Sequence, residues 1–166
     1  MARLIKDILK RNEEKKPKIL TSKNYIFAVG RRKSAVARVR IHNEDLIDPI
    51  IWGKEQVEKG SILVNQQPIG MYFNSPFAKA VYEEPLRITN TLGKYMITVK
   101  VEGGGKKGQL DALLHGIARA LNKINVEEFR PVLKKKGFLT RDSRIRERRK
   151  VGTGGKARRK KQSPKR

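Results

Sequence analysis

The residues that could carry out chemistry are few and scattered. The two histidines, His42 and His115, are far apart in the sequence, and neither adjoins a carboxylate-rich motif. A metal site needs three or four ligands at a recognisable spacing, so the pattern predicts no metal site and we expect both histidines at the surface. Glu83 and Glu84 are adjacent, and on a helix their side chains diverge, which makes a poor acid–base pair. The chain has no cysteine. The sequence therefore predicts no catalytic residues and no enzyme.

The glycine-rich stretch "GGGKKGQ" at residues 103–109 is the one motif that resembles a cofactor loop. It follows an expected strand and opens an expected helix, which is where backbone amides can hold a phosphate. It lacks the Lys-Ser/Thr ending of a P-loop and does not fit the dinucleotide spacing. We therefore expect a tight turn and no bound cofactor, although its amides could still hold a phosphate of a larger ligand.

The charge of the chain points to a polyanionic partner. Lys and Arg number 40 against 16 Asp and Glu, which gives a net charge of +24. Residues 134–166 alone contain 16 basic and 2 acidic side chains. Such an excess repels itself without counter-charge. The sequence thus predicts a globular body that carries a polybasic C-terminal tail.

The tail has the composition of a segment that binds nucleic acid. In residues 143–166 only Glu147 opposes the Lys and Arg side chains. Arginine suits planar contacts with phosphates and stacking on bases. Glycines at 152, 154 and 155 let the backbone follow an irregular groove. With little apolar surface, the tail should be disordered until a partner orders it. The absence of a dimerisation heptad favours folded RNA over duplex DNA as the partner. The two histidines are then expected at the surface or facing the RNA.

Periodicity places these features on helices and strands. Residues 25–42 predict a β-hairpin with a turn at 30–33, in which Arg38 and Arg40 face away from the buried side. Leu110, Leu113, Leu114, Ile117, Leu121 and Ile124 form one apolar stripe of a helix. The other expected elements are a helical turn near 54–59, strands over 61–68 and 94–105, a helix between Pro76 and Pro85 with a second short helix after the break, and a helix from Asn125 that Pro131 disturbs and Gly137 ends.

These elements divide the chain into an arm, a body and a tail. We expect a basic arm over residues 1–24 with a possible short helix at 4–11, a body over 25–137 with a loop excursion at 43–60, and the tail over 138–166. No apolar run approaches the roughly 20 residues of a membrane span. The opening segment resembles neither a signal nor a transit peptide. The chain is thus expected in the cytoplasm, with no membrane partner and no small-molecule substrate.

Four segments together resemble a known family. They read "AVGRRKSAVARVRI", "GSILVNQQPIGMYF", "ITVKVEGGGKKGQLDALLHGIARAL" and "RPVLKKKGFLTRDSRIRERRKVGTGGKARRKKQSPKR". In order and spacing they are similar to the ninth protein of the small ribosomal subunit, over roughly residues 25–166. The resemblance implies an α+β fold, a small sheet with helices on one face that is shared with the second domain of the fifth small-subunit protein. It also implies a structural role in the ribosome, with an organelle matrix or stroma as the less expected location.

The resemblance implies a set of partners and contact residues. The body would lie in the subunit head against ribosomal RNA and neighbouring ribosomal proteins, and the tail would reach the anticodon stem-loop of the peptidyl-site transfer RNA. The transfer RNA contacts would be Lys165 and Arg166, the terminal pair. With the residues that the charge pattern adds, the expected ribosomal RNA contacts are Arg31, Arg32, Lys33, Arg38, Arg40, Lys106, Lys107, His115, Arg119, Arg141, Arg144, Arg148, Arg149, Lys150, Lys156, Arg158, Arg159, Lys160 and Lys161.

The sequence departs from the family pattern at a few of these positions. Ser163 and Pro164 replace the usual Phe-Ser before the terminal pair, and a proline stiffens this approach. Leu114 replaces the usual Arg before the helix histidine, and Lys107 replaces a Ser and adds a possible phosphate contact. An alternative from the residues alone is a general RNA-binding or nucleoid-associated basic protein. An enzyme on the same fold is the other alternative, and the missing convergent site disfavours it.

Overall fold

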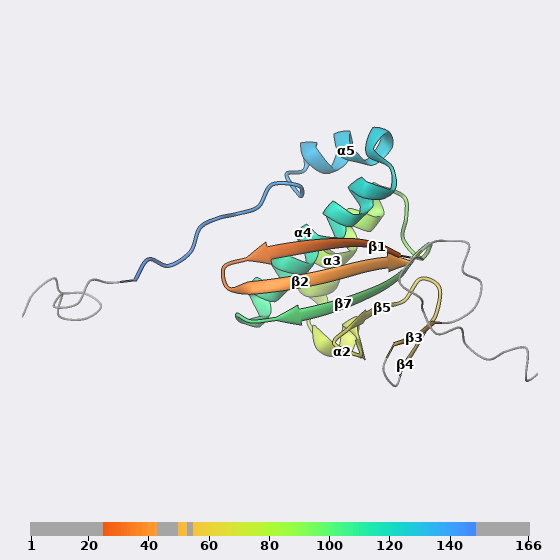
Figure 1. Ribbon diagram of the computed structural model, residues 1–166, viewed down its shortest axis with the longest axis horizontal. Coiled ribbons are helices and arrows are strands. Elements are labelled where there is room, and N and C mark those ends of the chain that lie inside the picture. Colours follow the sequence, from red (N-terminus) through yellow and green to blue (C-terminus); the bar gives the residue numbers. More distant parts are fainter. Residues whose placement is uncertain (1–24, 43–49, 53–54, 149–166) are drawn as a thin grey trace, which may run out of the picture.

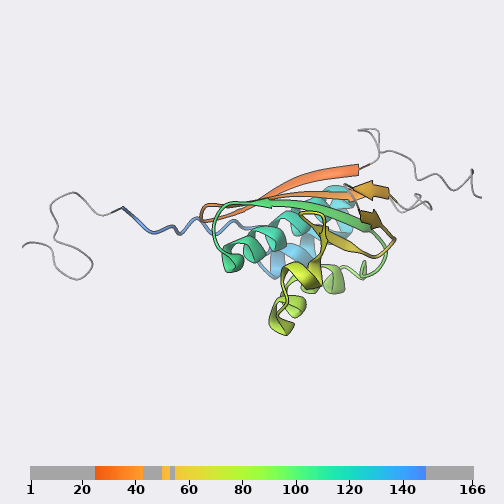
Figure 2. The same cartoon turned by 90° about the horizontal axis from the view of Figure 1, so that it is seen from below.

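A computed structural model of the chain describes residues 25–42, 50–52 and 55–148. It has the α+β architecture that was predicted, with one five-stranded sheet and its helices gathered on a single face of that sheet (Figures 1 and 2). The N-terminal arm at 1–24, residues 43–49 and 53–54 of the excursion, and the tail from residue 149 lie outside the described residues.

The predicted N-terminal hairpin is confirmed. Strand β1 (Tyr25–Arg32) pairs antiparallel with β2 (Ala35–His42), and Gly30 lies opposite Ala37. The turn between them is tight because Lys33 adopts a left-handed backbone with φ of 51°. A left-handed residue matches the twist of a two-residue hairpin connection. The turn therefore projects its basic side chains from the end of the sheet.

The remaining strands complete a mixed sheet. Strand β7 (Met96–Glu102) pairs antiparallel with β2, and β5 (Ile62–Val64) pairs parallel with β7. Strand β6 (Gln67–Pro68) closes the order β1-β2-β7-β5-β6. The strand predicted over 94–105 is thus confirmed in its central part. The side-chain amide of Asn65 extends the pairing, since it accepts from the backbone N–H of Val101 at 2.8 Å and donates to its carbonyl at 3.0 Å.

Two local predictions in the middle of the chain are wrong. The single strand expected over 61–68 is a tight hairpin, because Asn65 and Gln66 both adopt left-handed conformations, with φ of 49° and 65°. The helical turn expected near 54–59 is instead strand β4 (Glu55–Val57), which pairs with β3 (Ile50–Trp52) in a second, two-stranded sheet. Pairing with a neighbouring strand decided both segments.

Helix α2 (Ile69–Tyr72), which was not predicted, leads into α3 (Pro76–Ile88). The break expected at Pro85 is wrong, because α3 continues through the proline for another turn. The Pro85 ring is buried, and the Thr89 hydroxyl donates to the Pro85 carbonyl at 2.8 Å. Burial of the ring and of its neighbour Leu86 against the core offsets the one backbone hydrogen bond that the proline removes.

The long helix α4 (Lys106–Ile124) carries the predicted apolar stripe into the core. Leu113, Ile117 and Leu121 are fully buried. Helix α5 (Val126–Lys135) begins as predicted, with the Asn125 side chain accepting from the backbone N–H of Glu128 at 3.2 Å. The disturbance expected at Pro131 is wrong, since α5 runs on to Lys135. A proline in a short, partly exposed helix removes only one hydrogen bond.

Helix α4 touches the sheet most closely where two glycines face each other. A Cβ atom on Gly30 of β1 would lie 1.9 Å from the carbonyl oxygen of Ala112 and 2.4 Å from the backbone nitrogen of Gly116. A Cβ atom on Gly116 would lie 2.6 Å from a methyl group of Val39. Backbone therefore packs on backbone at this crossing. The contact fixes the height of α4 over the β1–β2 hairpin.

Candidate nucleic-acid interface

Basic side chains gather at one end of the body, where three segments meet. The β1–β2 turn provides Arg31 and Lys33, the start of α4 provides Lys107, and the start of the tail provides Arg141 and Arg144; we call these residues the basic corner. All five side chains are exposed. Figure 1 shows the β1–β2 turn and the outgoing segment 141–148 at the same end of the molecule. Residues far apart in the sequence thus form one positively charged surface.

Two hollows lie in this surface. One has a volume of about 380 Å³ and lies between Arg31, His115 and the tail, and the other, of about 340 Å³, lies between Lys33 and the start of α4. The predicted tight turn before α4 is confirmed: Gly103 has φ of 74°, and a Cβ atom there would lie 2.5 Å from the Ser34 carbonyl oxygen. This turn presses the N-terminus of α4 against the hairpin turn.

Arg32 points into the protein, unlike its neighbour Arg31. Its guanidinium lies 2.9 Å from the carboxylate of Asp142 and 3.6 Å from that of Asp111, and it donates to the Arg144 carbonyl at 2.7 Å. Its side chain is only 15% exposed. We call these four residues the tail clasp. The clasp joins β1, α4 and the first residues of the tail, so it sets the direction in which the tail leaves the body.

Asp142 remains ionised within the tail clasp. The Arg144 guanidinium donates to both of its carboxylate oxygens, at 2.7 to 3.2 Å, and the Arg144 backbone N–H donates at 2.9 Å. These hydrogen bonds, with the charges of Arg144 and Arg32, hold the pKa of Asp142 well below its usual range. The clasp is therefore an ion pair at any physiological pH.

Two other predicted RNA contacts also have protein partners. The Lys106 ammonium lies 3.4 Å from the centre of the Tyr72 ring and donates to the Tyr72 carbonyl at 3.1 Å. Arg119 donates to the Val29 carbonyl at 2.5 Å, beside Lys123, which donates to the Phe27 carbonyl at 2.7 Å. The last two contacts cover carbonyls of the edge strand β1, where an uncovered edge would invite pairing with another chain.

One of the two histidines, His42, does not lie where it was predicted. The surface position expected for His42 is wrong, because the ring is fully buried and its Nε2 atom lies 3.1 Å from the Thr98 hydroxyl. Burial, and then the charge of Arg40, lower its pKa to about 4. His115 is half-buried, and its Nδ1 atom accepts from the backbone N–H of Arg31 at 3.4 Å. Burial and the Arg119 charge lower its pKa as well, so His115 accepts hydrogen bonds but carries no charge at neutral pH.

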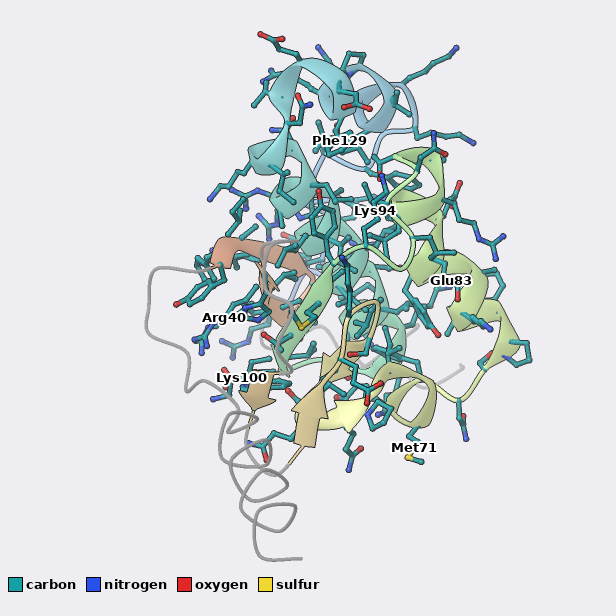
Figure 3. The ribbon with its side chains drawn as sticks, turned by 90° about the vertical axis from the view of Figure 1, so that its right-hand side faces the viewer. Arg40, Met71, Glu83, Lys94, Lys100 and Phe129 are labelled. Atoms are coloured by element: carbon teal, nitrogen blue, oxygen red, sulfur yellow. The ribbon has the colours of Figure 1, made fainter. Side chains whose placement is uncertain are left out.

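A second basic group lies on the open face of the sheet. Arg38 and Arg40 are exposed on this face, as predicted, and Lys100 of β7 lies opposite Arg38. In Figure 3, Arg40 and Lys100 lie on the side of the sheet away from Glu83 of α3. Lys100 was missed because the pairing of β7 with β2 cannot be read from the sequence. The alternation of residues 96–102 was the signal that could have placed it on the open face.

Two kinds of site are absent from the described residues, and some of the predicted contacts lie outside those residues. Residues 25–42, 50–52 and 55–148 contain no group of three or more side chains placed to hold a metal ion. Within the same ranges, no helix has the length and apolar character needed to cross a membrane. The predicted contacts that lie outside the described residues are Arg149, Lys150, Lys156, Arg158, Arg159, Lys160, Lys161, Lys165 and Arg166.

Comparison with known proteins finds matches among ribosomal proteins. A family model described as ribosomal protein S9/S16 matches residues 30–166. The chain is 43% identical to small ribosomal subunit protein uS9 of Maridesulfovibrio salexigens over 134 residues, which cover 81% of this chain and 92% of that protein. It is 45% identical to protein uS9 of Syntrophobacter fumaroxidans over 126 residues, which cover 76% and 85%.

The chain belongs to the ribosomal protein S9/S16 family. The resemblance found in the sequence is thereby confirmed. Members of this family are structural proteins rather than enzymes, so the prediction that the chain is not an enzyme is confirmed by its family.

Proposed function

We propose that this protein is a structural constituent of the small ribosomal subunit. It binds the large ribosomal RNA of the subunit head, contacts neighbouring ribosomal proteins there, and works in the cytoplasm as part of the ribosome. The observation that supports this most directly is the basic corner, where cations from the hairpin turn, the start of α4 and the tail converge. RNA phosphates supply the counter-charge that this surface lacks.

Ribosomal RNA engages the body through the basic corner. Within the described residues, the side chains of Arg31, Lys33 and Lys107 have no ion-pair partner, so their charges are available to phosphates. Helix α4 begins with two lysines in its first turn and no acidic residue there. Because the start of a helix favours a negative charge, a phosphate at this position would be held both by the backbone amides and by the lysines.

The tail carries the contact with transfer RNA. The tail clasp directs residues 141–148 away from the body (Figure 1), and the remaining residues neutralise RNA phosphates along their path. Lys165 and Arg166 at the tip bind the anticodon stem-loop of the peptidyl-site transfer RNA. Because its guanidinium can hold two phosphate oxygens at once, Arg166 is the main contact.

Chemical footprinting of reconstituted small subunits tests this function. Subunits with the full chain are compared with subunits whose protein ends after Lys161, each with bound transfer RNA. Truncation should remove the protections at the anticodon stem-loop and leave those of the head RNA intact. If the stem-loop protections survive truncation, the transfer RNA contact is wrong.

A binding assay separates this function from general RNA binding. The full chain is titrated with RNA of the subunit head and with an unrelated folded RNA of equal length at the same salt concentration. A ribosomal protein should prefer the head RNA, whereas a general RNA-binding or nucleoid-associated protein should bind both equally. For either RNA, the logarithm of the binding constant should fall with the logarithm of the salt concentration, with a slope of about 0.7 to 0.9 per phosphate contact. Salt dependence therefore does not separate the two functions, and the preference for head RNA does.

A further inference from the structure

A separate hollow lies on the open face of the sheet, on the side away from the helices. It has a volume of about 220 Å³ and is lined by Arg38, Arg40, Trp52, Thr98 and Lys100. We call it the sheet-face hollow. Since a water molecule takes up about 30 Å³ in the liquid, this volume has room for a planar group of several heavy atoms.

The charges around the sheet-face hollow call for an anion. Arg38 lies directly opposite Lys100 on the neighbouring strand, and like charges in this position destabilise a sheet. Glu102 contacts both, at 3.7 Å from Arg38 and 2.8 Å from Lys100. Arg40 adds a third cation, stacked 4.9 Å from the centre of the Tyr25 ring. Among the side chains that the structure describes here, Glu102 is the one carboxylate paired with these cations, and it contacts Arg38 and Lys100 but not Arg40, so positive charge remains for a ligand.

Trp52 gives the sheet-face hollow a wall that a simple anion site does not need. Its half-buried indole comes from β3, in the small second sheet, and lies beside the cations of β2 and β7. Bases of single-stranded nucleic acid stack on aromatic rings while nearby basic groups bind their phosphates. A base in a duplex has no free face for such stacking. The combination of indole and cations thus favours an unpaired nucleotide over a duplex or an acidic peptide.

We propose that the sheet-face hollow binds one unpaired nucleotide of RNA, with the base on Trp52 and the phosphate between Arg38, Arg40 and Lys100. This proposal rests on the proposed function, because ribosomal RNA is the partner that presents such a nucleotide. It adds a second RNA contact to the body, distinct from the basic corner. It also gives the β3–β4 sheet a role, namely to place an aromatic ring over the open face.

Trp52 is itself the probe that tests the proposal, because the chain contains a single tryptophan. The full chain is titrated with a ten-nucleotide oligoadenylate and with an abasic ribose-phosphate oligomer of the same length. The oligoadenylate should quench the fluorescence in step with binding, and the abasic oligomer should bind the basic groups with little quenching. Equal quenching by both, or binding of oligoadenylate without quenching, would overturn the proposal.

Two variants and a matched control extend the test. Trp52→Ala should reduce the preference for oligoadenylate over the abasic oligomer about fivefold or more in filter binding, as expected for the loss of one stacked base. Arg40→Gln should weaken quenching, whereas Lys134→Gln, which removes an equal charge from the exposed end of α5, should not. An unchanged preference in Trp52→Ala would contradict the assignment of the base to the indole.

The remaining outcomes distinguish this proposal from the proposed function. If the full chain prefers head RNA but oligoadenylate does not quench Trp52, only the sheet-face hollow is wrongly assigned. If the chain shows no preference for head RNA, the proposed function fails as well. Quenching by a polyglutamate peptide in place of oligoadenylate would assign the hollow to an acidic protein and overturn the nucleotide proposal.

Discussion

The contact between Gly30 and Gly116 should make the body intolerant of a single methyl group. In Gly30→Ala, the new Cβ atom would lie 1.9 Å from the Ala112 carbonyl oxygen, whereas an ordinary contact begins at 3.4 Å. Strand β1 and helix α4 must therefore separate by about 1.5 Å at this point. The obstructing atoms belong to the backbone, so no side chain can rotate out of the way. The helix as a whole must move.

The expected cost exceeds that of ordinary overpacking. Extra methyl groups in a well-packed core usually cost about 1 to 3 kcal/mol. Here the shift also loosens Leu113 and Ile117, which are fully buried beside the crossing. We expect the free energy of unfolding to fall by about 3 kcal/mol or more. Replacing a strand glycine by alanine stabilises a strand by up to about 1 kcal/mol, which is too little to offset this loss. For a body of this size, the loss corresponds to a fall in Tm of about 12 °C.

Urea unfolding followed by circular dichroism measures this loss, with Gly70→Ala as the matched control. Gly70 lies in α2, is exposed, and has no atom within 4 Å of an added Cβ atom, so the same substitution should be neutral or slightly stabilising there. Gly116→Ala should resemble Gly30→Ala, because it acts on the same crossing. A change below about 1 kcal/mol in Gly30→Ala would refute the close backbone contact.

Three further predictions concern single side chains. Burial and Arg40 lower the pKa of His42 to about 4, so as the pH falls the unfolded chain binds a proton at this residue before the folded chain does. The free energy of unfolding should therefore be fully retained above pH 6.5 and drop by about 3 kcal/mol between pH 6.5 and 4. In His42→Gln, the free energy of unfolding should not show this drop between pH 6.5 and 4. If the free energy of unfolding falls equally with pH in both proteins, the prediction is contradicted. Arg32→Gln should speed hydrogen exchange of the amides at 142–145 several-fold by opening the tail clasp, while Arg31→Gln, with the same loss of charge, should leave them unchanged; equal effects would show that charge alone matters. Asn125→Ala should lower the free energy of unfolding by about 1 kcal/mol through loss of the α5 cap, against less than about 0.5 kcal/mol for the exposed Asn74→Ala, as measured by urea unfolding.

The sequence alone was sufficient where a structure depends on near neighbours along the chain. The hairpin at 25–42 and the apolar stripe of α4 are local periodic patterns, and both were predicted correctly. The position of the charge is equally local, because 16 basic residues fall within 134–166 whatever the fold. The family resemblance rests on the order of such segments. These features together identified a basic α+β protein that binds nucleic acid.

Tertiary structure decided what each basic residue contacts. Arg31 and Arg32 are adjacent and chemically identical, yet Arg31 is exposed and Arg32 holds Asp142 in the tail clasp. The difference depends on where α4 and the tail lie relative to β1, and no local pattern contains that information. Similarly, the pairing of β7 with β2 brings the Thr98 hydroxyl to the buried ring of His42. Lys100 reaches the sheet-face hollow through the same pairing.

The predictions for the two prolines and for the short strands were wrong for a related reason. Pro85 and Pro131 were expected to break or disturb helices, because proline is unfavourable within an isolated helix. In the folded chain both helices continue, and burial of Pro85 against the core outweighs the lost hydrogen bond. Strand β4 exists because β3 pairs with it. Local propensity determined which elements were possible, and strand pairing and burial in the core, which are worth more free energy than propensity, determined which of them formed.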